Sequence, residues 1–152
     1  MASFTTVTTV RSQAHSMLSE KHIQGIVDRG LCPELAADMG LYSARRSRDG
    51  SGNLAFEPDP KGEVLCLPFF EHGTEVNCKY RWAEDGERRF MQKKGGTKTL
   101  YNAEVILNEE TLIELETENY DLIWVEGEFD CIASIECGFP HTVSVPDGAP
   151  PA

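Results

Sequence analysis

The feature that most constrains the fold is a short apolar run that stops at a cluster of carboxylates. The run is Leu122–Val125, and the residues after it are Glu126, Gly127, Glu128, Phe129 and Asp130. A short run of β-branched and aromatic residues is typical of a buried strand. Gly127 allows the chain to turn sharply behind the strand. Because ligands and metals bind at the carboxyl ends of strands in open α/β sheets, the carboxylates stand where a site would form.

A helix and a second strand are predicted after this run. Ile132 and Ile135 lie three positions apart on one helix face, and Gly138 is a good terminating residue. Thr142–Val145 then has strand character and is followed by a Pro-Asp-Gly turn. The order strand, helix, strand predicts a βαβ unit.

The carboxylates admit two interpretations. In the first, Glu128 and Asp130 occupy the first helical turn, where the helix dipole favours negative charge, and Glu126 faces solvent. In the second, Glu126, Glu128 and Asp130 together hold Mg²⁺ or Mn²⁺, since such hard cations prefer oxygen ligands. A bound ion of this kind orients phosphates and stabilises an attacking oxygen. Spacing alone does not decide between the two.

The segment Val125–Pro151 resembles the first half of a TOPRIM domain, the fold shared by primases, type IA and type II topoisomerases and some nucleases. Its ending, Val143–Ala149 (Val-Ser-Val-Pro-Asp-Gly-Ala), is similar in particular to the primase-helicases of bacteriophages and to their mitochondrial relative, Twinkle. Upstream, Gly62–Phe70 and Cys78–Asn102 resemble the amino-terminal subdomain of the polymerase part of those primases. Ile26–Tyr42 looks like a short helical lead-in to that subdomain.

Three parts are expected along the chain. Residues 1–20 are expected to form a flexible arm, residues 21–118 the amino-terminal subdomain of the primase polymerase domain, and residues 119–152 the first part of the TOPRIM domain. The fold class is expected to be α+β: a helical lead-in, a small antiparallel β subdomain, a helix at Val105–Glu118, and a truncated α/β TOPRIM half.

Strand patterns fill the middle part. Val64–Phe70 and Thr74–Trp82 flank a His-Gly turn, and an Asp-Gly pair precedes a third strand at Arg88–Lys93. Arg45–Lys61 is rich in Gly, Pro and Asp, so we expect mostly loop there, with one edge strand at Leu54–Phe56.

Positive charge is concentrated in one segment of an acidic chain. The formal net charge is −11, yet the segment from Lys79 to Lys98 contains seven basic residues and only three acidic ones. Nucleic acids bind by exchanging counterions for Lys and Arg side chains, so this segment focuses the positive field. The predicted contacts to nucleic acid or nucleotide are Lys79, Arg81, Arg88, Arg89, Lys93, Lys94 and Lys98.

These basic residues also have a structural interpretation, because charge on a strand face or hairpin edge prevents pairing with another sheet. In the functional interpretation they form a groove for single-stranded template or nucleotide phosphates. Lys79 and Arg81 point to one side, since strand side chains alternate, and arginine can bind a phosphate with two hydrogen bonds. Trp82 and Phe90 are able to stack on bases, although core packing is the expected role of each.

The family resemblance makes Glu126 the predicted catalytic residue, acting with a later Asp-x-Asp to bind Mg²⁺. No Asp-x-Asp follows Glu126 in this chain, no Cys-x-x-Cys pair offers a zinc ribbon, and no Walker A loop is present. No zinc is therefore expected, and whether this chain is itself an enzyme is left open. We expect a fragment, a truncated product or one piece of a split enzyme, which binds rather than catalyses.

Three functions remain open. The first is a part of a DNA primase or primase-helicase that makes RNA primers in replication, with single-stranded DNA and ribonucleotides as partners and a helicase domain or the remaining TOPRIM half as further candidates. The second is a non-catalytic module, derived from a phage replication protein, that binds nucleic acid or a protein partner. The third is a nuclease remnant, which the primase-like ending at Val143–Ala149 disfavours.

The composition indicates where in the cell the protein is expected. No apolar run is as long as a membrane span, and the five cysteines are scattered as reduced core thiols would be. We therefore expect no membrane partner and a cytoplasmic location, either in a bacterium or in a phage-infected cell.

Overall fold

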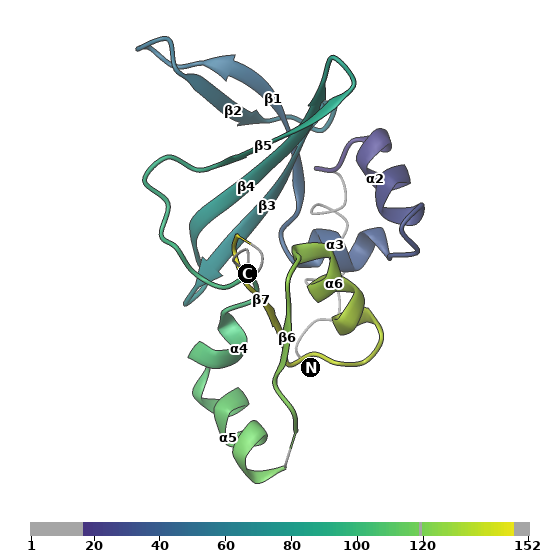
Figure 1. Cartoon of the computed structure of the whole chain (residues 1–152), viewed down its shortest axis with the longest axis vertical. Helices are drawn as coiled ribbons and strands as arrows, with labels where there is room; N and C mark the ends of the chain where they lie inside the picture. The colour runs from purple at the N-terminus through teal and green to yellow at the C-terminus, as the bar shows by residue number, and fades with distance from the viewer. Residues whose placement is uncertain (1–16, 119, 148–152) are drawn as a thin grey trace, which may run out of the picture. The chain divides into compact units, whose positions relative to one another are not determined.

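The structure is a computed structural model and describes residues 17–118 and 120–147. The arm expected over residues 1–20 lies mostly outside the described residues. The elements in chain order are α2 (Glu20–Val27), α3 (Pro33–Asp38), β1 (Tyr42–Arg48), β2 (Leu54–Pro58), β3 (Val64–Glu71), β4 (Thr74–Glu84), β5 (Glu87–Gln92), α4 (Glu104–Leu107), α5 (Glu109–Thr117), β6 (Ile123–Val125), α6 (Glu128–Glu136) and β7 (Thr142–Ser144) (Figure 1). The predicted α+β class is confirmed.

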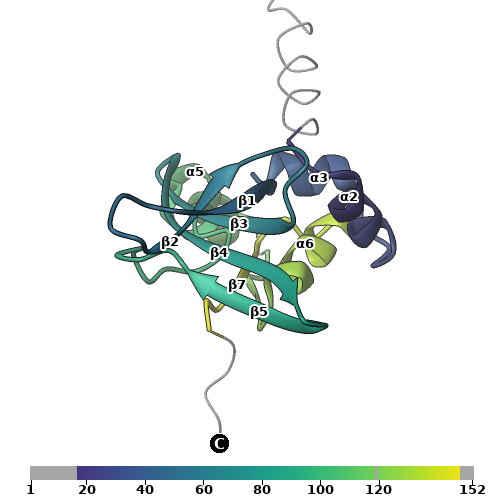
Figure 2. The ribbon, with the colours of Figure 1, turned by 90° about the horizontal axis from the view of Figure 1, so that it is seen from above.

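Five strands form one sheet in the order β2-β1-β3-β4-β5 (Figure 2). Two of its turns are tight hairpins in which both central residues have a positive φ: His72 and Gly73 at 50° and 75°, and Asp85 and Gly86 at 51° and 77°. Such turns match the right-handed twist of the strands they connect, and a glycine in the second position lowers their cost. The three strands predicted around these turns are present.

Strand β1 corrects the expectation that Arg45–Lys61 is mostly loop. β1 pairs antiparallel with β2, Arg46 facing Phe56, and with β3, Ser43 facing Leu65. After Tyr42 the strand contains no β-branched or aromatic residue, so local propensity gives no strand signal. Hydrogen bonding to a neighbour on each side overrides that weak propensity.

The helical lead-in is present as predicted. Ser19 caps α2 by accepting a hydrogen bond from the His22 backbone N–H, and Gly30 follows the helix with a φ of 76°. Helix α3 begins at Pro33, whose fixed φ suits the first helical position, and Gly40 follows its end with a φ of 93°.

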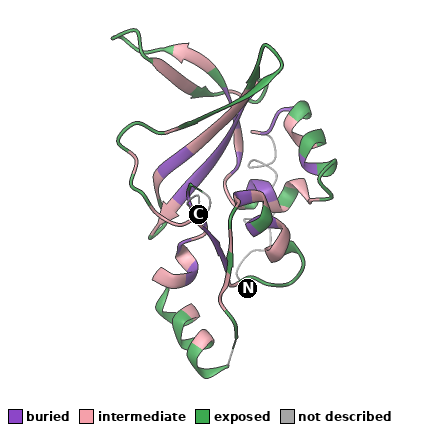
Figure 3. Cartoon of the chain, viewed as in Figure 1, coloured by how far each residue is buried: buried purple, intermediate pink, exposed green. Residues whose placement is uncertain are grey.

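The chain divides into two compact units. Unit 1 comprises Met1–Leu67 and Lys79–Met91, and unit 2 comprises Pro68–Cys78 and Gln92–Ala152. The buried core, purple in Figure 3, includes Ile26 and Leu41 in unit 1. In unit 2 it includes Phe69, Tyr101 and Ile132, with the Phe69 and Tyr101 rings in edge-to-face contact at 5.3 Å. The predicted domain boundary between residues 118 and 119 stays a prediction.

Unit 2 contains the predicted βαβ motif. β6 pairs parallel with β7, Val125 facing Ser144, and α6 connects them. Ser144 exchanges two backbone hydrogen bonds with Tyr101, so β7 has a neighbour on each side and is buried along its length. The expectation of a buried strand is wrong for β6 at Trp124, which is exposed. Among the described residues, β6 pairs with β7 alone.

The helix predicted at Val105–Glu118 is divided into α4 and α5. Asn108 has an extended backbone, and its side chain accepts a hydrogen bond from the Thr111 N–H, so it caps α5. Helix α5 buries none of its residues and is mostly green in Figure 3. Leu112 and Ile113 are both exposed.

Candidate functional site

The three predicted metal ligands lie around the amino terminus of α6. Glu126 directly follows β6 and is exposed, as is Asp130 in the first turn of the helix. Gly127 between them has an extended backbone, with a φ of −130°. The glycine therefore serves close approach rather than a sharp turn, because a Cβ at this position would lie 2.9 Å from the Asp130 carboxylate.

Glu128 differs from the other two, since only 6% of it is exposed. Its negative charge acts on buried neighbours in unit 2. Burial first, and the Glu128 carboxylate second, raise the pKa of the Cys131 thiol to about 12. Burial is also the main cause that raises the pKa of Tyr101, whose hydroxyl makes no hydrogen bond to the described residues. Cys131 therefore stays a thiol at neutral pH, and its S–H donates to the Thr142 carbonyl at 3.3 Å.

The structure thus places two of the predicted ligands in solvent and one among buried groups. Among residues 17–118 and 120–147, no three His, Cys, Asp or Glu side chains form a group able to hold a metal ion. Glu126 and Asp130 have the donor chemistry that suits Mg²⁺, which commonly binds one or two carboxylates and completes its shell with water and phosphate oxygens. The metal site at Glu126, Glu128 and Asp130 stays a prediction.

The hairpin β4–β5 divides the basic residues of unit 1 between its two faces. The Arg81 guanidinium lies 5.0 Å from the centre of the Phe90 ring, so these residues share a face. Because strand side chains alternate, Lys79 and Arg88 lie on the same face. We call Lys79, Arg81, Arg88 and Phe90 the Arg81–Phe90 face.

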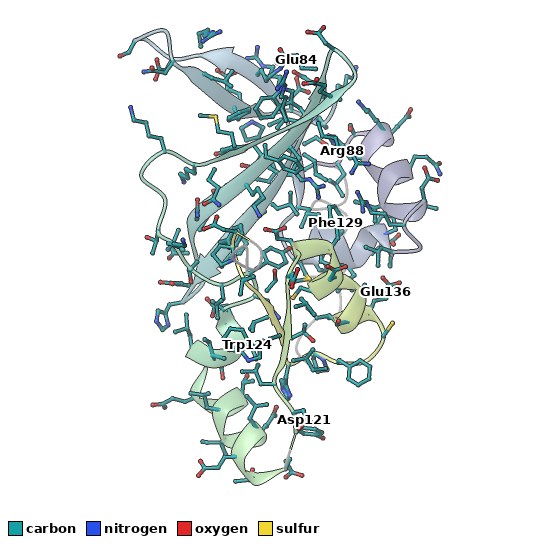
Figure 4. All side chains as sticks on the ribbon, in the orientation of Figure 1. Glu84, Arg88, Asp121, Trp124, Phe129 and Glu136 are labelled. Atoms are coloured by element: carbon teal, nitrogen blue, oxygen red, sulfur yellow. The ribbon has the colours of Figure 1, made fainter. Side chains whose placement is uncertain are left out.

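Arg89 lies on the opposite face of the hairpin. Its guanidinium is 2.9 Å from the Glu87 carboxylate and 4.0 Å from that of Glu84. Figure 4 labels Glu84 and Arg88 near the β4–β5 turn. Arg89 is therefore separated from the Arg81–Phe90 face, and the predicted single groove is not formed by all the hairpin residues together.

The remaining basic residues belong to unit 2, and two of them meet acids from outside the basic segment. Lys93 lies 3.5 Å from Glu75, and Lys98 lies 2.8 Å from Asp147. Asp147 also accepts a hydrogen bond from Gln92 at 2.6 Å. Exposed ion pairs contribute roughly 0 to 1 kcal/mol, so these lysines could exchange their acids for phosphates at little cost. Lys94 is exposed.

The two aromatic residues of the basic segment behave differently. Trp82 is half-buried and packs against Phe56 at 5.6 Å and beneath the Arg46 guanidinium at 5.9 Å. Phe90 is 57% exposed, so the expectation of core packing is wrong for this residue. The Arg46 side chain was not singled out from the sequence. It contacts Glu63 at 2.9 Å and Glu84 at 2.8 Å, so it joins strands β1 and β4 to the loop before β3.

Comparison with known proteins identifies the family. The chain is 39% identical over 87 residues to the Primase homolog protein of Arabidopsis thaliana, a match that covers 57% of this chain and 22% of that protein. It is 37% identical over 128 residues to the Twinkle homolog protein, chloroplastic/mitochondrial, of the same plant, with 84% of this chain and 16% of that protein covered. The chain belongs to the primase/Twinkle-type family.

The fold of this family member agrees with a solved primase. The crystal structure of the Aquifex aeolicus primase (zinc binding and RNA polymerase domains) matches with a TM-score of 0.64 and 14% identity, over 92% of this chain and 41% of that one. The chain spans about a fifth of the length of the two plant relatives. No model of a protein family matched. Within the described ranges, no helix is long and apolar enough to cross a membrane.

Proposed function

We propose that this chain is the part of a primase-like replication protein that binds single-stranded DNA template and nucleotide during the synthesis of RNA primers. Membership of the primase/Twinkle-type family supports this function. The observation that carries the binding role is the Arg81–Phe90 face, where an exposed aromatic ring lies under a guanidinium. Single strands bind where bases can stack on aromatic rings and phosphates can meet basic side chains.

Within this proposal the βαβ motif supplies the acidic half of the site. Glu126 and Asp130 would hold Mg²⁺ beside phosphate oxygens, and the bound ion would supply charge stabilisation for phosphoryl transfer. The basic residues would bind and orient the phosphates. The sequence contains no Asp-x-Asp after Glu126, so we expect this chain by itself to bind rather than catalyse.

A second candidate is a non-catalytic module that binds nucleic acid or a protein partner. The observation in its favour is that Glu128, one of the three predicted metal ligands, is buried and only 6% exposed. A helicase domain as partner and a cytoplasmic location stay predictions.

Fluorescence anisotropy with a labelled oligo-dT strand tests the template-binding role. Arg81→Gln should weaken binding and lower the slope of log K against log salt by about 0.7, the expected loss for one phosphate contact with a single strand. Phe90→Leu should cost about 1 to 3 kcal/mol of binding free energy, because leucine keeps apolar area but cannot stack on a base.

Lys61→Gln provides the matched control. Lys61 is exposed and lies in a turn outside the basic segment, so its loss removes the same charge without touching the Arg81–Phe90 face. If Lys61→Gln weakened binding as much as Arg81→Gln, overall charge rather than this face would explain the affinity, and the proposed template site would be wrong.

A further inference from the structure

Unit 2 contains a cavity that no part of the proposed function uses. Its volume is about 490 Å³. It lies between α5, the segment that leads into β6 and the loop between α6 and β7. The side chains that matter for its chemistry are Glu114, Tyr120, Asp121, Phe139, Pro140 and His141. Figure 4 labels Asp121 between α5 and β6.

The cavity lies at the opposite end of β6 from the predicted metal ligands. Ile123, the first residue of β6, lines it, whereas Glu126 follows the last residue of the same strand. At about 3.3 Å per residue, three residues of strand separate the two places by roughly 10 Å. A ligand in the cavity would therefore not occupy the position of a metal at Glu126.

Aromatic rings form much of the wall, and two of them are open to solvent. Tyr120 is 56% exposed and Phe139 is 54% exposed, although both border a hollow. The His141 ring stands 5.4 Å from the Tyr120 ring at an angle of 58°. Ring faces that are exposed in a concave site can bind a flat or cationic group.

The charge of the cavity wall favours a cationic ligand. Glu114 and Asp121 line the cavity, and no Lys or Arg is among its lining residues in the described chain. The Glu114 carboxylate is also 3.6 Å from His141 Nε2. The helix that carries Glu114 adds further carboxylates at Glu109, Glu110 and Glu116. Negative potential of this kind repels phosphates, so nucleic acid is a poor ligand and a cation is a good one.

We propose that this cavity binds an arginine side chain from a basic segment of a protein partner. A guanidinium fits both halves of the wall, because its planar face stacks on aromatic rings while its fork of N–H donors binds a carboxylate. A lysine ammonium matches the carboxylates but lacks the planar face for stacking. The exposed rings of Tyr120 and Phe139 would stack on the guanidinium, and Glu114 and Asp121 would accept its hydrogen bonds.

The test uses the full chain labelled with ¹⁵N and an acetyl-Gly-Arg-Gly-Arg-Gly-amide peptide as probe. The backbone amide signals of Tyr120, Ile123 and His141 should shift in a saturable way. The same peptide with citrulline in place of arginine keeps the shape but loses the charge, and it should bind measurably more weakly. Equal shifts with the citrulline peptide, or no saturable shift with either, would overturn the proposal.

Variants on and off the cavity wall sharpen the test. Glu114→Gln and Asp121→Asn should each weaken the arginine peptide about twofold to fivefold, as expected for an exposed ion pair. Glu110→Gln, on the same helix but outside the cavity, should leave the affinity unchanged. An equal loss in Glu110→Gln would show nonspecific attraction to an acidic helix and would overturn the site.

Further titrations test two other possible occupants of the cavity, nucleic acid and a second copy of this chain. Shifts of the same amide signals by an oligo-dT strand would show that the cavity binds nucleic acid, contrary to the proposal. Shifts on concentrating the protein alone would show that a second copy of this chain is the occupant, which would overturn the assignment to a separate partner.

Discussion

His22 joins the start of the first helix to the first strand of the sheet. Its Nδ1 lies 2.7 Å from the Ser43 hydroxyl and 3.0 Å from that of Ser19, and the Ser19 N–H donates to the same Ser43 hydroxyl at 2.7 Å. Burial first, and Lys21 second, lower the pKa of His22 from its ordinary value of 6.5. The folded protein therefore favours the neutral imidazole in this position.

The lowered pKa of His22 predicts that acid destabilises unit 1. Below pH 6.5 the unfolded chain binds a proton at His22 that the folded chain binds less readily, so the free energy of unfolding falls as the pH drops through 6.5 toward the folded pKa. Above 6.5 the contribution is complete. The melting temperature of the wild type should decrease between about pH 7.5 and about pH 5, and His22→Asn should reduce that slope.

The exposed turn residue His72 supplies the control, because His72→Asn removes an imidazole while asparagine tolerates its positive φ of 50°. This variant should keep the wild-type slope. If His22→Asn kept it as well, some other group would be responsible for the acid sensitivity.

At the scale of elements, α5 is unusual because it has nine residues and buries none of them. Packing therefore contributes little to its stability, which depends mainly on local interactions, chiefly the Asn108 cap and the acids of the first turn. The same helix carries Glu114 into the cavity wall, so fraying of α5 would also disturb the proposed arginine site.

Removing the cap should therefore loosen α5 selectively. Asn108→Ala should lower the local opening free energy of α5 by about 1 kcal/mol, and Asn108→Asp should retain most of it because aspartate also caps well. Amide hydrogen exchange of Leu112 and Leu115, compared with buried Val143, measures the difference. Faster exchange at Val143 to the same extent would indicate global rather than local destabilisation, against this prediction.

The elements that could be predicted from the sequence are those with strong local signals. The turns at His72-Gly73 and Asp85-Gly86 could be predicted because glycine favours the positive φ that these tight hairpin turns require. The strand-helix-strand order after Leu122 could be predicted from the hydrophobic pattern. β1 could not be predicted, because pairing with β2 and β3, rather than the strand propensity of its own residues, forms it. The break at Asn108 did have a signal, an asparagine followed by two glutamates, which is typical of a helix start.

The candidate site could be predicted only in part for a related reason. Residue types and spacing indicate the carboxylates around Glu126 and the basic segment, but they do not say which side chains share a face or which charges are buried. Glu128 is buried beside Tyr101 and Cys131, and Arg89 lies on the opposite face from Arg81. The burial of Glu128 depends on tertiary packing. Alternation places Arg88 and Arg89 on opposite faces of β5, but only the pairing of β4 with β5 shows which of those faces Arg81 shares.

At the scale of the whole molecule, the proposed function gives basic residues the role of binding phosphates and acidic residues the role of holding a metal ion. The chain has a formal net charge of −11, so its affinity for a polyanion must come from local positive charge or from a cation that bridges two negative groups. Lys93 and Lys98 already contact acids of the same unit. A bridging metal at Glu126 would add a second attraction for phosphates. The primase-like function includes a metal ion at Glu126 and the non-catalytic module does not, so metal binding there distinguishes the two candidates.

Manganese offers a direct probe of that bridge, because Mn²⁺ prefers oxygen ligands as Mg²⁺ does and broadens nearby NMR signals. In the primase-like function, low Mn²⁺ should broaden the amide signals of Glu126, Gly127 and Asp130 first, and Mg²⁺ should compete. Glu126→Ala should remove most of this broadening, whereas Glu136→Ala at the other end of α6 should leave it unchanged. With Mg²⁺ present, oligo-dT should then bind the wild type more tightly than Glu126→Ala. Broadening that Glu126→Ala leaves intact would favour the non-catalytic module, since the residue that the family motif assigns to the metal would not be holding one.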